Sequence, residues 1–314
     1  MNSRPKMSRF DQMRAMASSM FKQRRKPNPA LAISPADSDL NGKTVAFTGG
    51  TDGMGRVAVE LLHKMGATVI LLGRNEAKGQ ALIDELGSNV RFVHCDLVSL
   101  ESVRSAASKV LADYPEIHVL VNNAGVNLGD RQETPEGFEA HWVINYLGSY
   151  LLTNLLLDRL QASAPARIVN VSSATEALGH INFDNLQLER NFSTGKAYSQ
   201  AKLALNMFTI HLSRQLEGSG VTVNALNPGF IKSNLLRDLK GKERVGSILM
   251  LLFASPALVG ADRIVRLAVS SAYEGVSGQF VFEDAARLPN PEALDDTIVE
   301  RLMEVSRAQA GLEG

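Results

Sequence analysis

Short apolar runs rich in Val and Ile recur along the chain, and Gly, Asn or Asp residues bound them. Six have the length of a strand; they are TVAF, TVILL, VRFVHC, IHVLV, RIVNV and VTVNAL, which begin at residues 44, 68, 90, 117, 167 and 221. Helical patterns lie between them, such as residues 75–86, which Asn75 can cap and Gly87 can end. This alternation predicts an α/β fold with one doubly wound parallel sheet covered by helices on both faces.

A different pattern occupies the first 38 residues. Residues 1–26 hold eight basic side chains and one acidic one, and their apolar residues recur at helical spacing. Such a basic amphipathic helix can lie on an anionic membrane surface or target an organelle; it can equally be a leader that docks on its own domain or has no role. Residues 27–39 have the composition of a proline-rich linker. We therefore expect an arm and linker over residues 1–38 and one folded domain over residues 39–314.

Composition narrows the class of protein. The chain has 33 basic and 33 acidic side chains, and we expect no nucleic-acid partner. Its one cysteine, Cys95, excludes a disulfide framework and fits a reducing compartment, so we expect a cytoplasmic protein, with peripheral membrane contact through residues 1–26 left open. The apolar run at residues 248–254 is far shorter than the ~20 residues of a transmembrane helix. The histidines show no zinc-binding spacing, and we expect no metal.

A glycine-rich stretch, TGGTDGMG at residues 48–55, separates the first predicted strand from the first predicted helix. The carboxyl end of a strand is where open α/β sheets bind ligands. Glycines there let the backbone approach a pyrophosphate, while the helix N-terminus supplies N–H donors and a positive dipole end. A tight turn that serves packing alone is the alternative.

The end of the second predicted strand bears on cofactor choice. Residues 73–75 read GRN, without the acidic residue that accepts hydrogen bonds from the ribose of NAD. Arg74 instead offers a charged fork for the 2′-phosphate of NADP. Asp52, inside the glycine-rich stretch, opposes this by adding a negative charge. We predict NADP(H), with NAD(H) as the alternative.

Tyr198 and Lys202 occur in the stretch AYSQAKLAL and are four residues apart, so a helix places them on one face. A free tyrosine has a pKa near ~10 and is a poor base at neutral pH. A nearby ammonium favours the phenolate and lowers that pKa, which lets Tyr198 exchange a proton with a substrate oxygen. An exposed helix with an accidental Tyr–Lys pair is the alternative.

Five motifs occur together in the chain, and their combination is more specific than any one of them: TGxxxGxG at 48–55, NNAG at 122–125, VNVSS at 169–173, YxxxK at 198–202 and NPG at 227–229. In order and spacing, residues 41–312 resemble the short-chain dehydrogenase/reductase family. The stretches at 95–104, 137–157, 181–189 and 301–312, and the 24 residues between Ser173 and Tyr198, are similar to its retinol dehydrogenase branch, which includes WW-domain oxidoreductase. Two features depart from that branch. The basic arm replaces a membrane helix, and ATEA follows Ser173 where histidine is frequent.

The resemblance implies a Rossmann domain, a nicotinamide cofactor and hydride transfer to or from a carbonyl or alcohol carbon. It implies catalytic roles for Tyr198 as general acid/base, Lys202 as its pKa-lowering partner, Ser173 as hydrogen-bond donor to the carbonyl oxygen, and Asn145 as holder of a relay water. Cofactor-binding residues implied in the same way are Gly49, Thr51, Asp52, Gly53, Met54, Gly55, Arg74, Asp96, Leu97, Asn123, Ala124, Gly125, Pro228, Gly229, Ile231 and Ser233.

The sequence gives weaker indications of the substrate and of the oligomeric state. Ile248 to Phe253 fall where the family has its substrate lid, and an apolar lid implies a lipophilic substrate such as a retinoid, steroid or fatty aldehyde. Closure of the core explains these residues equally well. Helices expected over 135–160 and 197–217 are the pair through which relatives form homodimers, but packing on the sheet also explains them.

The alternative function is a redox-sensing scaffold that binds NADP(H) without turnover and is recruited through the arm. The presence of Tyr198, Lys202 and Ser173 favours the enzyme.

Overall fold

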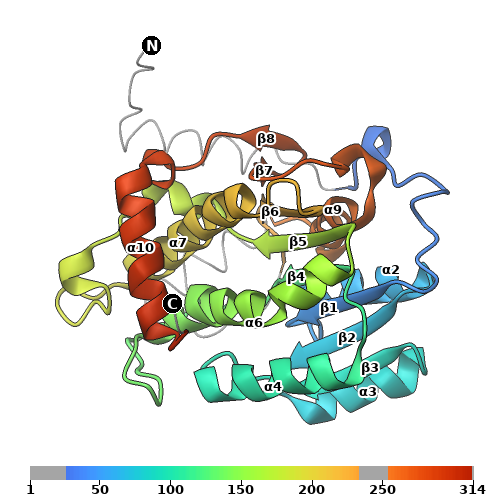
Figure 1. Ribbon diagram of the computed structural model, residues 1–314, viewed down its shortest axis with the longest axis horizontal. Coiled ribbons are helices and arrows are strands. Elements are labelled where there is room, and N and C mark those ends of the chain that lie inside the picture. Colours follow the sequence, from blue (N-terminus) through green and yellow to red (C-terminus); the bar gives the residue numbers. More distant parts are fainter. Residues whose placement is uncertain (1–25, 233–253, 313–314) are drawn as a thin grey trace.

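The computed structural model describes residues 26–232 and 254–312 (Figure 1). The predicted amphipathic arm, the expected lid at Ile248 to Phe253 and the predicted cofactor residue Ser233 therefore lie outside the described residues. No helix within the described ranges has the length and apolar character needed to cross a membrane.

The described residues form one eight-stranded sheet in the order β3-β2-β1-β4-β5-β6-β7-β8 (Figure 1). Its strands are β1 Thr44–Thr48, β2 Thr68–Gly73, β3 Val90–His94, β4 Val119–Asn122, β5 Ala166–Val171, β6 Val221–Asn227, β7 Phe280–Phe282 and β8 Ala285–Arg287. All neighbours pair in parallel except β7 and β8. The six predicted strands are thus confirmed. The short β7 and β8 were not predicted.

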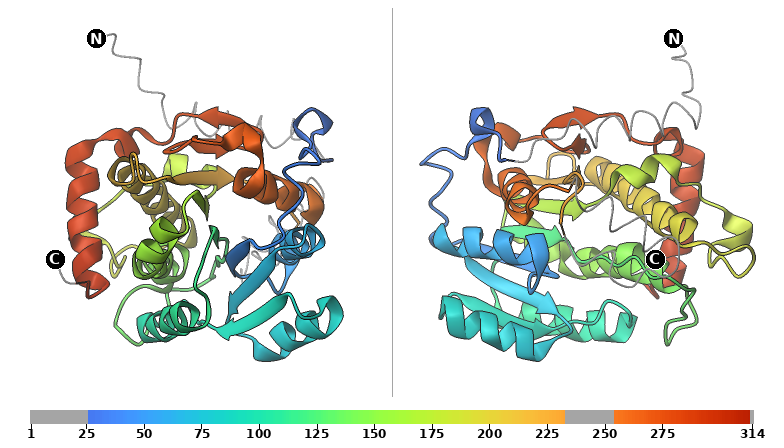
Figure 2. Two further views of the ribbon diagram at one scale, coloured as in Figure 1. Left: turned by 45° about the vertical axis from the view of Figure 1, so that its right-hand side comes forward. Right: turned by 180° about the vertical axis from the view of Figure 1, so that it is seen from behind.

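Helices cover both faces of the sheet, as predicted (Figures 1 and 2). They are α2 Gly53–Lys64, α3 Glu76–Leu86 and α9 Ala257–Val269 on one face, and α4 Leu100–Asp113, α6 Gly148–Ala162 and α7 Thr194–Gln215 on the other. Within β1, Val45 and Phe47 pack into the first layer and Ala46 into the second. All three are fully buried, because a strand between two helical layers has no polar face.

Helix boundaries follow side-chain caps. Asn75 accepts a hydrogen bond from the backbone N–H of Lys78 and begins α3, and Gly87, at φ +89°, ends it, as predicted. The helix predicted over 135–160 is wrong at its start. Glu139 accepts a hydrogen bond from the N–H of Trp142, so the helix begins only at α5, Ala140–Trp142. It continues through the π-helical turn η2, Val143–Leu147, into α6.

The last helix, α10 Asp296–Gln309, lies against α7 and the η2 turn (Figure 1). The Trp142 indole N–H donates to Gln309 at 2.8 Å, and the Tyr146 hydroxyl bonds Ser306 at 2.6 Å. The chain's own last helix therefore covers part of the helix pair on which we placed a homodimer interface, a prediction that stays open.

The segment before β1 contacts the domain. Ile33 is partly buried against the core layer that includes α2 and α9, and Asp37 accepts a hydrogen bond from Ser271 at 3.0 Å. Cys95 directly follows β3 and is 3% exposed, within the core.

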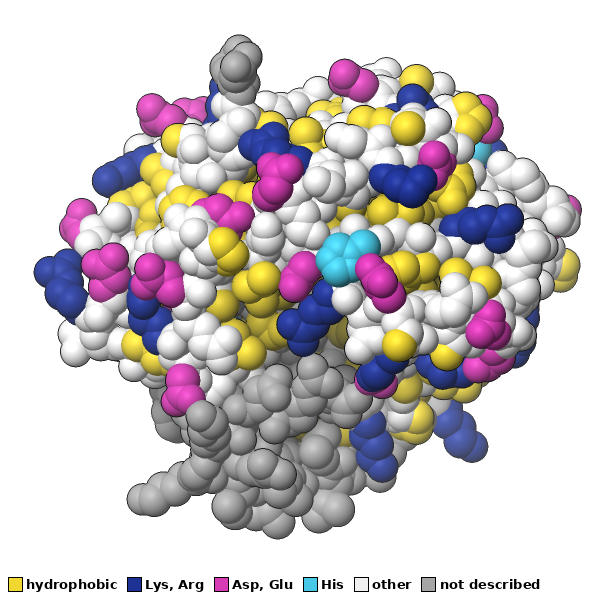
Figure 3. All heavy atoms as spheres, turned by 90° about the horizontal axis from the view of Figure 1, so that it is seen from below, with side chains coloured by type: hydrophobic (Ala, Val, Ile, Leu, Met, Phe, Trp, Pro, Cys, Tyr) yellow, Lys and Arg dark blue, Asp and Glu magenta, His cyan; other side chains and the backbone are white. Residues whose placement is uncertain are grey.

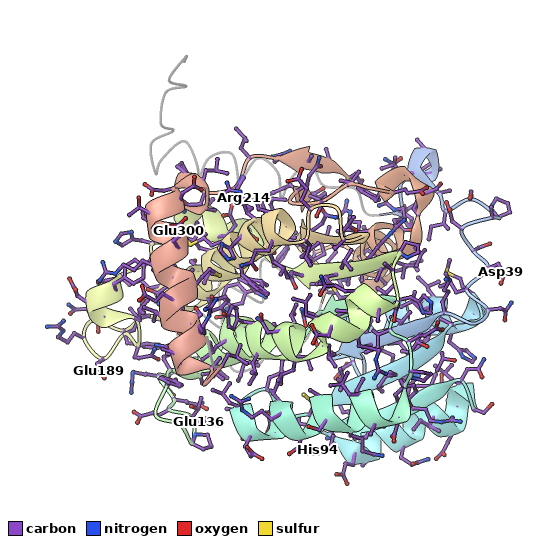
Figure 4. All side chains as sticks on the ribbon, viewed as in Figure 1. Asp39, His94, Glu136, Glu189, Arg214 and Glu300 are labelled. Carbon is purple, nitrogen blue, oxygen red and sulfur yellow. The ribbon has the colours of Figure 1, made fainter. Side chains whose placement is uncertain are left out.

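Charged side chains gather at the periphery. Acidic and basic groups are interspersed on the face seen in Figure 3. Of the side chains labelled in Figure 4, Asp39, His94, Glu136 and Glu189 lie at the rim of the view, whereas Arg214 and Glu300 lie beside α7 and α10. The charged groups inside the fold are therefore the exceptions that call for a physical reason.

Candidate active site

The glycine-rich turn after β1 requires glycine at two points. Gly49 has φ +69°, and a Cβ there would lie 2.8 Å from the Cα of Ala124. A Cβ on Gly55 would lie 2.4 Å from the carbonyl oxygen of Gly49. No side chain fits in either place, so the start of α2 folds tightly back on the end of β1. The remaining predicted residues of this stretch, Thr51, Gly53 and Met54, are only partly buried.

The loop after β4 is tied to this turn. Thr48 Oγ1 accepts the backbone N–H groups of Asn123 and Ala124, both at 3.0 Å. The Asn123 amide donates to the carbonyls of Thr48 and Gly49 at 3.0 and 3.1 Å. Its Oδ1 is buried and has no hydrogen-bond partner among the described residues. A buried free acceptor beside a helix N-terminus and a glycine turn fits a dinucleotide, so the residues present suit the cofactor implied by the sequence.

Charge at this end of the sheet is arranged differently from the sequence expectation. Arg74 follows β2 and is exposed. Asp52, expected to oppose it, caps α2 by accepting the N–H of Gly53 and pairs with Lys78 Nζ at 2.8 Å. Lys78 was not predicted to belong to the site. Its position four residues after Arg74 could have indicated a second positive charge on the same side of the helix.

Asp96 and Leu97 follow β3 and line the same edge. The Asp96 carboxylate accepts the backbone N–H of Val98 at 3.2 Å, while its own N–H donates to Ser102 Oγ at 2.9 Å. Leu97 is 6% exposed and packs beneath Gly148. Its side chain belongs to the core, which leaves its backbone for any contact with a ligand.

Asn145 lies in the η2 turn, a helical irregularity of the kind that is frequent at functional sites. Its Oδ1 accepts the N–H of Val126 at 2.9 Å, and its Nδ2 donates to the carbonyl of Val126 at 3.0 Å. A Cβ on Gly125 would meet Asn145 Oδ1 at 2.8 Å and Lys202 Nζ at 3.5 Å. Gly125 therefore leaves the space that brings Asn145 and Lys202 together.

Ser173 and Tyr198 lie close enough for the serine to affect the titration of the tyrosine. Ser173 follows β5, and Tyr198 lies on α7 and is 8% exposed, with Ser173 acting to lower the pKa of its phenol. The Ser173 Oγ also accepts the Thr175 hydroxyl at 3.0 Å and the Thr175 N–H at 3.3 Å. Thr175 was not predicted, because nothing in ATEA marks its hydroxyl as turned back on the serine.

The pKa of Tyr198 departs from the sequence expectation. Burial raises it to about 12, with the Ser173 hydrogen bond acting in the opposite direction. Lys202 lies with Nζ 5.7 Å from the tyrosine ring centre and donates to the carbonyl of Val171 at 2.8 Å. Burial lowers the pKa of Lys202 to about 7. The ammonium that was to lower the pKa of Tyr198 is therefore only partly charged at neutral pH, because it is buried and no carboxylate of the described residues pairs with it.

A second buried acid follows the serine. Glu176 belongs to the 3-10 turn Ala174–Leu178 and is 2% exposed. Its Oε2 accepts the backbone N–H of Asn290 at 2.9 Å. Burial raises the pKa of Glu176 to about 7, and the Asn290 hydrogen bond only partly offsets this.

The β6 loop, residues 228–232, completes the site. Pro228 is followed by Gly229 at φ +85°, and Ile231 is 7% exposed. Ile231 and Ser255 form an isolated parallel bridge, with Lys232 N–H donating to the Ser255 carbonyl and Ser255 N–H to that of Phe230. Every predicted site residue within the described ranges thus lies near the carboxyl ends of the strands.

Comparison with known proteins decides the family. The model of the short chain dehydrogenase family matches residues 43–244. The chain belongs to the short-chain dehydrogenase family. Retinol dehydrogenase 13 from Homo sapiens is 40% identical over 291 residues, which are 89% of this chain and 88% of that one. Polyprenol dehydrogenase from Homo sapiens is 40% identical over 265 residues, 80% of each chain.

A crystal structure of a protein from Mycobacterium paratuberculosis has the same fold, with a TM-score of 0.74 and 30% identity over 92% of this chain and 99% of that one. This short-chain dehydrogenase is therefore an oxidoreductase similar to the retinol dehydrogenases, with the Rossmann fold that the motifs predicted.

Proposed function

We propose that this short-chain dehydrogenase interconverts a carbonyl and an alcohol on a lipophilic substrate, with NADP(H) as cofactor and Tyr198 as general acid/base. The observation that carries the proposal is that Ser173, Tyr198 and Lys202 come together in the fold. The Ser173 side chain acts to lower the pKa of the Tyr198 phenol, and Lys202 Nζ lies 5.7 Å from the centre of the tyrosine ring. Hydroxyl, phenol and amine are the groups that a proton transfer to a reduced carbonyl oxygen needs.

The roles follow from the chemistry of these groups. Bound NADPH supplies the hydride and is held by the glycine turn, the loop after β4 and the β6 loop. Tyr198 donates its phenolic proton to the substrate oxygen as negative charge develops there. Ser173 donates a hydrogen bond to the same oxygen and stabilises that charge. Lys202, once its ammonium is charged, stabilises the phenolate left on Tyr198 and favours its reprotonation.

Electrostatics at the edge of β2 and β3 support NADP(H) over NAD(H). Arg74 is exposed there, and no acidic residue takes the position that would bind the ribose of NAD. The carboxylate of Asp52, which would repel a 2′-phosphate, is neutralised by Lys78 at 2.8 Å. Arg74, Lys78 and Asp52 together carry one net positive charge, which favours a phosphate.

The substrate class is supported by the relatives. Their names refer to retinol and polyprenol, both long apolar alcohols. The apolar residues at 248–254 of this chain suit a substrate of that kind.

A screen of NADPH oxidation by the purified full-length protein tests the function, with retinal, polyprenal, steroid ketones and fatty aldehydes as substrates. Tyr198→Phe is the control, because it removes the transferable proton and keeps the ring. We expect its turnover to fall below about a tenth of wild type while NADPH binding stays nearly intact.

Turnover by Tyr198→Phe at the wild-type rate with a verified substrate would remove Tyr198 from its role. NADPH binding without turnover of any class in the panel would favour the non-catalytic redox-sensing scaffold instead.

A further inference from the structure

Arg263 is a buried cation on α9 that none of the roles above uses. Its side chain is 2% exposed. Its Nη1 donates to the carbonyl oxygen of Pro228 at 2.7 Å, whereas the nearest carboxylate oxygens, on Glu283 and Asp284, are 3.3 Å away. The shortest contact of this guanidinium is therefore with the backbone of the β6 loop, and a charged donor makes that hydrogen bond strong.

Arg266, one helical turn further along α9, shows a different arrangement. It contacts Asp284 at 2.6 Å and Asp262 at 2.8 Å, and its side chain is 3% exposed. Among the described residues it donates to these two acids and to no carbonyl of the β6 loop. Arg266 thus stabilises the turn between β7 and β8 through its ion pair with Asp284. Arg263 also contacts this turn, but its shortest hydrogen bond is to the carbonyl of Pro228.

The contact to Pro228 acts on the peptide between Pro228 and Gly229. Gly229 has φ +85°, a conformation that favours glycine. The carbonyl of this peptide accepts from Arg263 Nη1 at 2.7 Å, and its N–H donates to Asn227 Oδ1 at 3.3 Å. The charged donor on α9 makes the stronger of these two contacts and thereby sets the orientation of the peptide.

A second observation brings α9 to the same loop. A Cβ on Gly260 would lie 2.9 Å from Ile231 Cγ1 and 2.9 Å from Met54 Sδ. Gly260 precedes Arg263 by about one helical turn, so both face the cofactor-binding loops. The helix therefore supports the β6 loop at two points, at Pro228 through a charged hydrogen bond and at Ile231 through close packing.

We propose that Arg263 is a positioning residue that fixes the Pro228–Gly229 peptide and thereby the backbone on which the nicotinamide half of the cofactor rests. This inference depends on the proposed function, in which the β6 loop flanks the nicotinamide. Arg263 then acts on the nicotinamide half alone, because the adenosine half binds on the other side of the switch in strand order, near Arg74 and Asp96.

Two ligands allow the two halves of the cofactor site to be tested separately. Titration calorimetry of the full-length protein measures affinity for NADP⁺, which fills both halves, and for 2′,5′-ADP, which fills only the adenosine half. For Arg263→Met, which keeps the apolar stem, we expect NADP⁺ to bind about tenfold more weakly, as loss of a hydrogen bond to a charged group predicts. The affinity for 2′,5′-ADP stays within about twofold, because that half does not touch the β6 loop.

Two further variants complete the design. Arg263→Lys keeps a charge but not the planar fork, and we expect an intermediate loss for NADP⁺ with 2′,5′-ADP unchanged. Arg266→Met is the matched control, since it breaks the neighbouring buried ion pairs. It lowers the unfolding temperature without changing the ratio of the two affinities. If Arg263→Met does not fold, Arg263→Lys alone decides.

Unchanged NADP⁺ affinity in the Arg263 variants, or equal losses for the two ligands, would overturn the positioning role. A wild-type protein that binds neither ligand overturns the proposed cofactor itself. If the wild type prefers NAD⁺, the same comparison is made with NAD⁺ and ADP-ribose.

Discussion

Arg74 and Lys78 share the task of presenting positive charge beside the glycine-rich turn, but they do so in different ways. Arg74 is exposed, whereas Lys78 pairs with Asp52 at 2.8 Å. In the proposed function, cofactor preference then depends on a local balance of three charges rather than on one arginine.

Arg74→Ala should weaken NADPH far more than NADH, by about 1.5–3 kcal/mol for a lost charge-assisted contact. Lys78→Ala should act in the same direction but less, because it exposes the charge of Asp52 without removing a phosphate contact. Fluorescence titration with both cofactors measures this. The control is Arg56→Ala, an exposed arginine of α2 that pairs with Glu60 at 2.8 Å. Equal losses for NADPH and NADH, or a wild-type preference for NADH, would contradict the assignment.

Glu176 makes the stability of the fold depend on pH. Its pKa is about 7 in the folded chain and near 4.5 when unfolded, so between these values the folded state binds an extra proton. The free energy of unfolding from this group therefore falls as pH rises from 4.5 to 7 and is level above that. The difference is about 3 kcal/mol at most, at ~1.4 kcal/mol per pH unit.

Glu176→Gln removes this titration and keeps an acceptor for Asn290. We expect the variant to match wild type in urea denaturation near pH 4.5 and to exceed it near pH 8 by up to about 3 kcal/mol. Parallel stability curves for the two proteins over this range would show that Glu176 does not titrate there.

At the scale of elements, the β1–α2 turn is built by close approach, and Gly55 is where it is tightest. Gly55→Ala places a Cβ 2.4 Å from a backbone oxygen, which must move. We expect a loss of about 1–3 kcal/mol in unfolding free energy, as for other overpacked sites, together with weaker NADPH binding. Gly195→Ala is the control, since a Cβ there meets nothing within 4 Å, and it should stabilise α7 slightly. If both variants behave alike in urea denaturation and NADPH titration, the turn is not the tight cradle that its geometry indicates.

The elements that the sequence predicted are those whose signals are local. The strands β1 to β6 are continuous apolar runs, and Asn75 and Gly87 mark the ends of α3 by their own chemistry. The start of the helix before Asn145 was placed too early because Glu139 caps it from within an otherwise helical pattern. β7 and β8 have three residues each, and β8 is exposed, so neither has enough apolar periodicity to be recognised.

The residues of the candidate site also fall into those that the sequence predicts and those that it does not. Tyr198, Lys202 and Ser173 lie in motifs, and their roles stay predictions. Lys78 and Arg263 make contacts that exist only after distant segments come together. Thr175 contacts the nearby Ser173, but its residue type does not show that its hydroxyl turns back on the serine. The direction of the Tyr198 pKa was also missed, because it depends on how deeply the fold buries the tyrosine itself.

At the scale of the whole molecule, the boundary between arm and domain can be tested by two truncations. Attraction of a basic helix to anionic lipid is partly electrostatic and fades with salt. Removing residues 1–25 should abolish sedimentation with phosphatidylserine vesicles at low salt and leave activity and stability unchanged. Removing residues 1–38 should also lower the unfolding temperature slightly, because it deletes the Ile33 packing and the Asp37–Ser271 hydrogen bond.

Full-length protein that never sediments with such vesicles would rule out the membrane role. Loss of activity on removing residues 1–25 would place part of the arm in the catalytic domain.

The burial of Cys95 makes the native chain inert toward thiol reagents. Burial raises the pKa of its thiol to about 12, so almost no thiolate is present at neutral pH, and the sulfur is enclosed by the core. Cys95 is also the chain's one cysteine. A cysteine introduced at an exposed position such as Ser88 would therefore be the one site that a maleimide dye or a nitroxide modifies. Distance and orientation measurements can then be made on otherwise native protein, without first replacing a core residue.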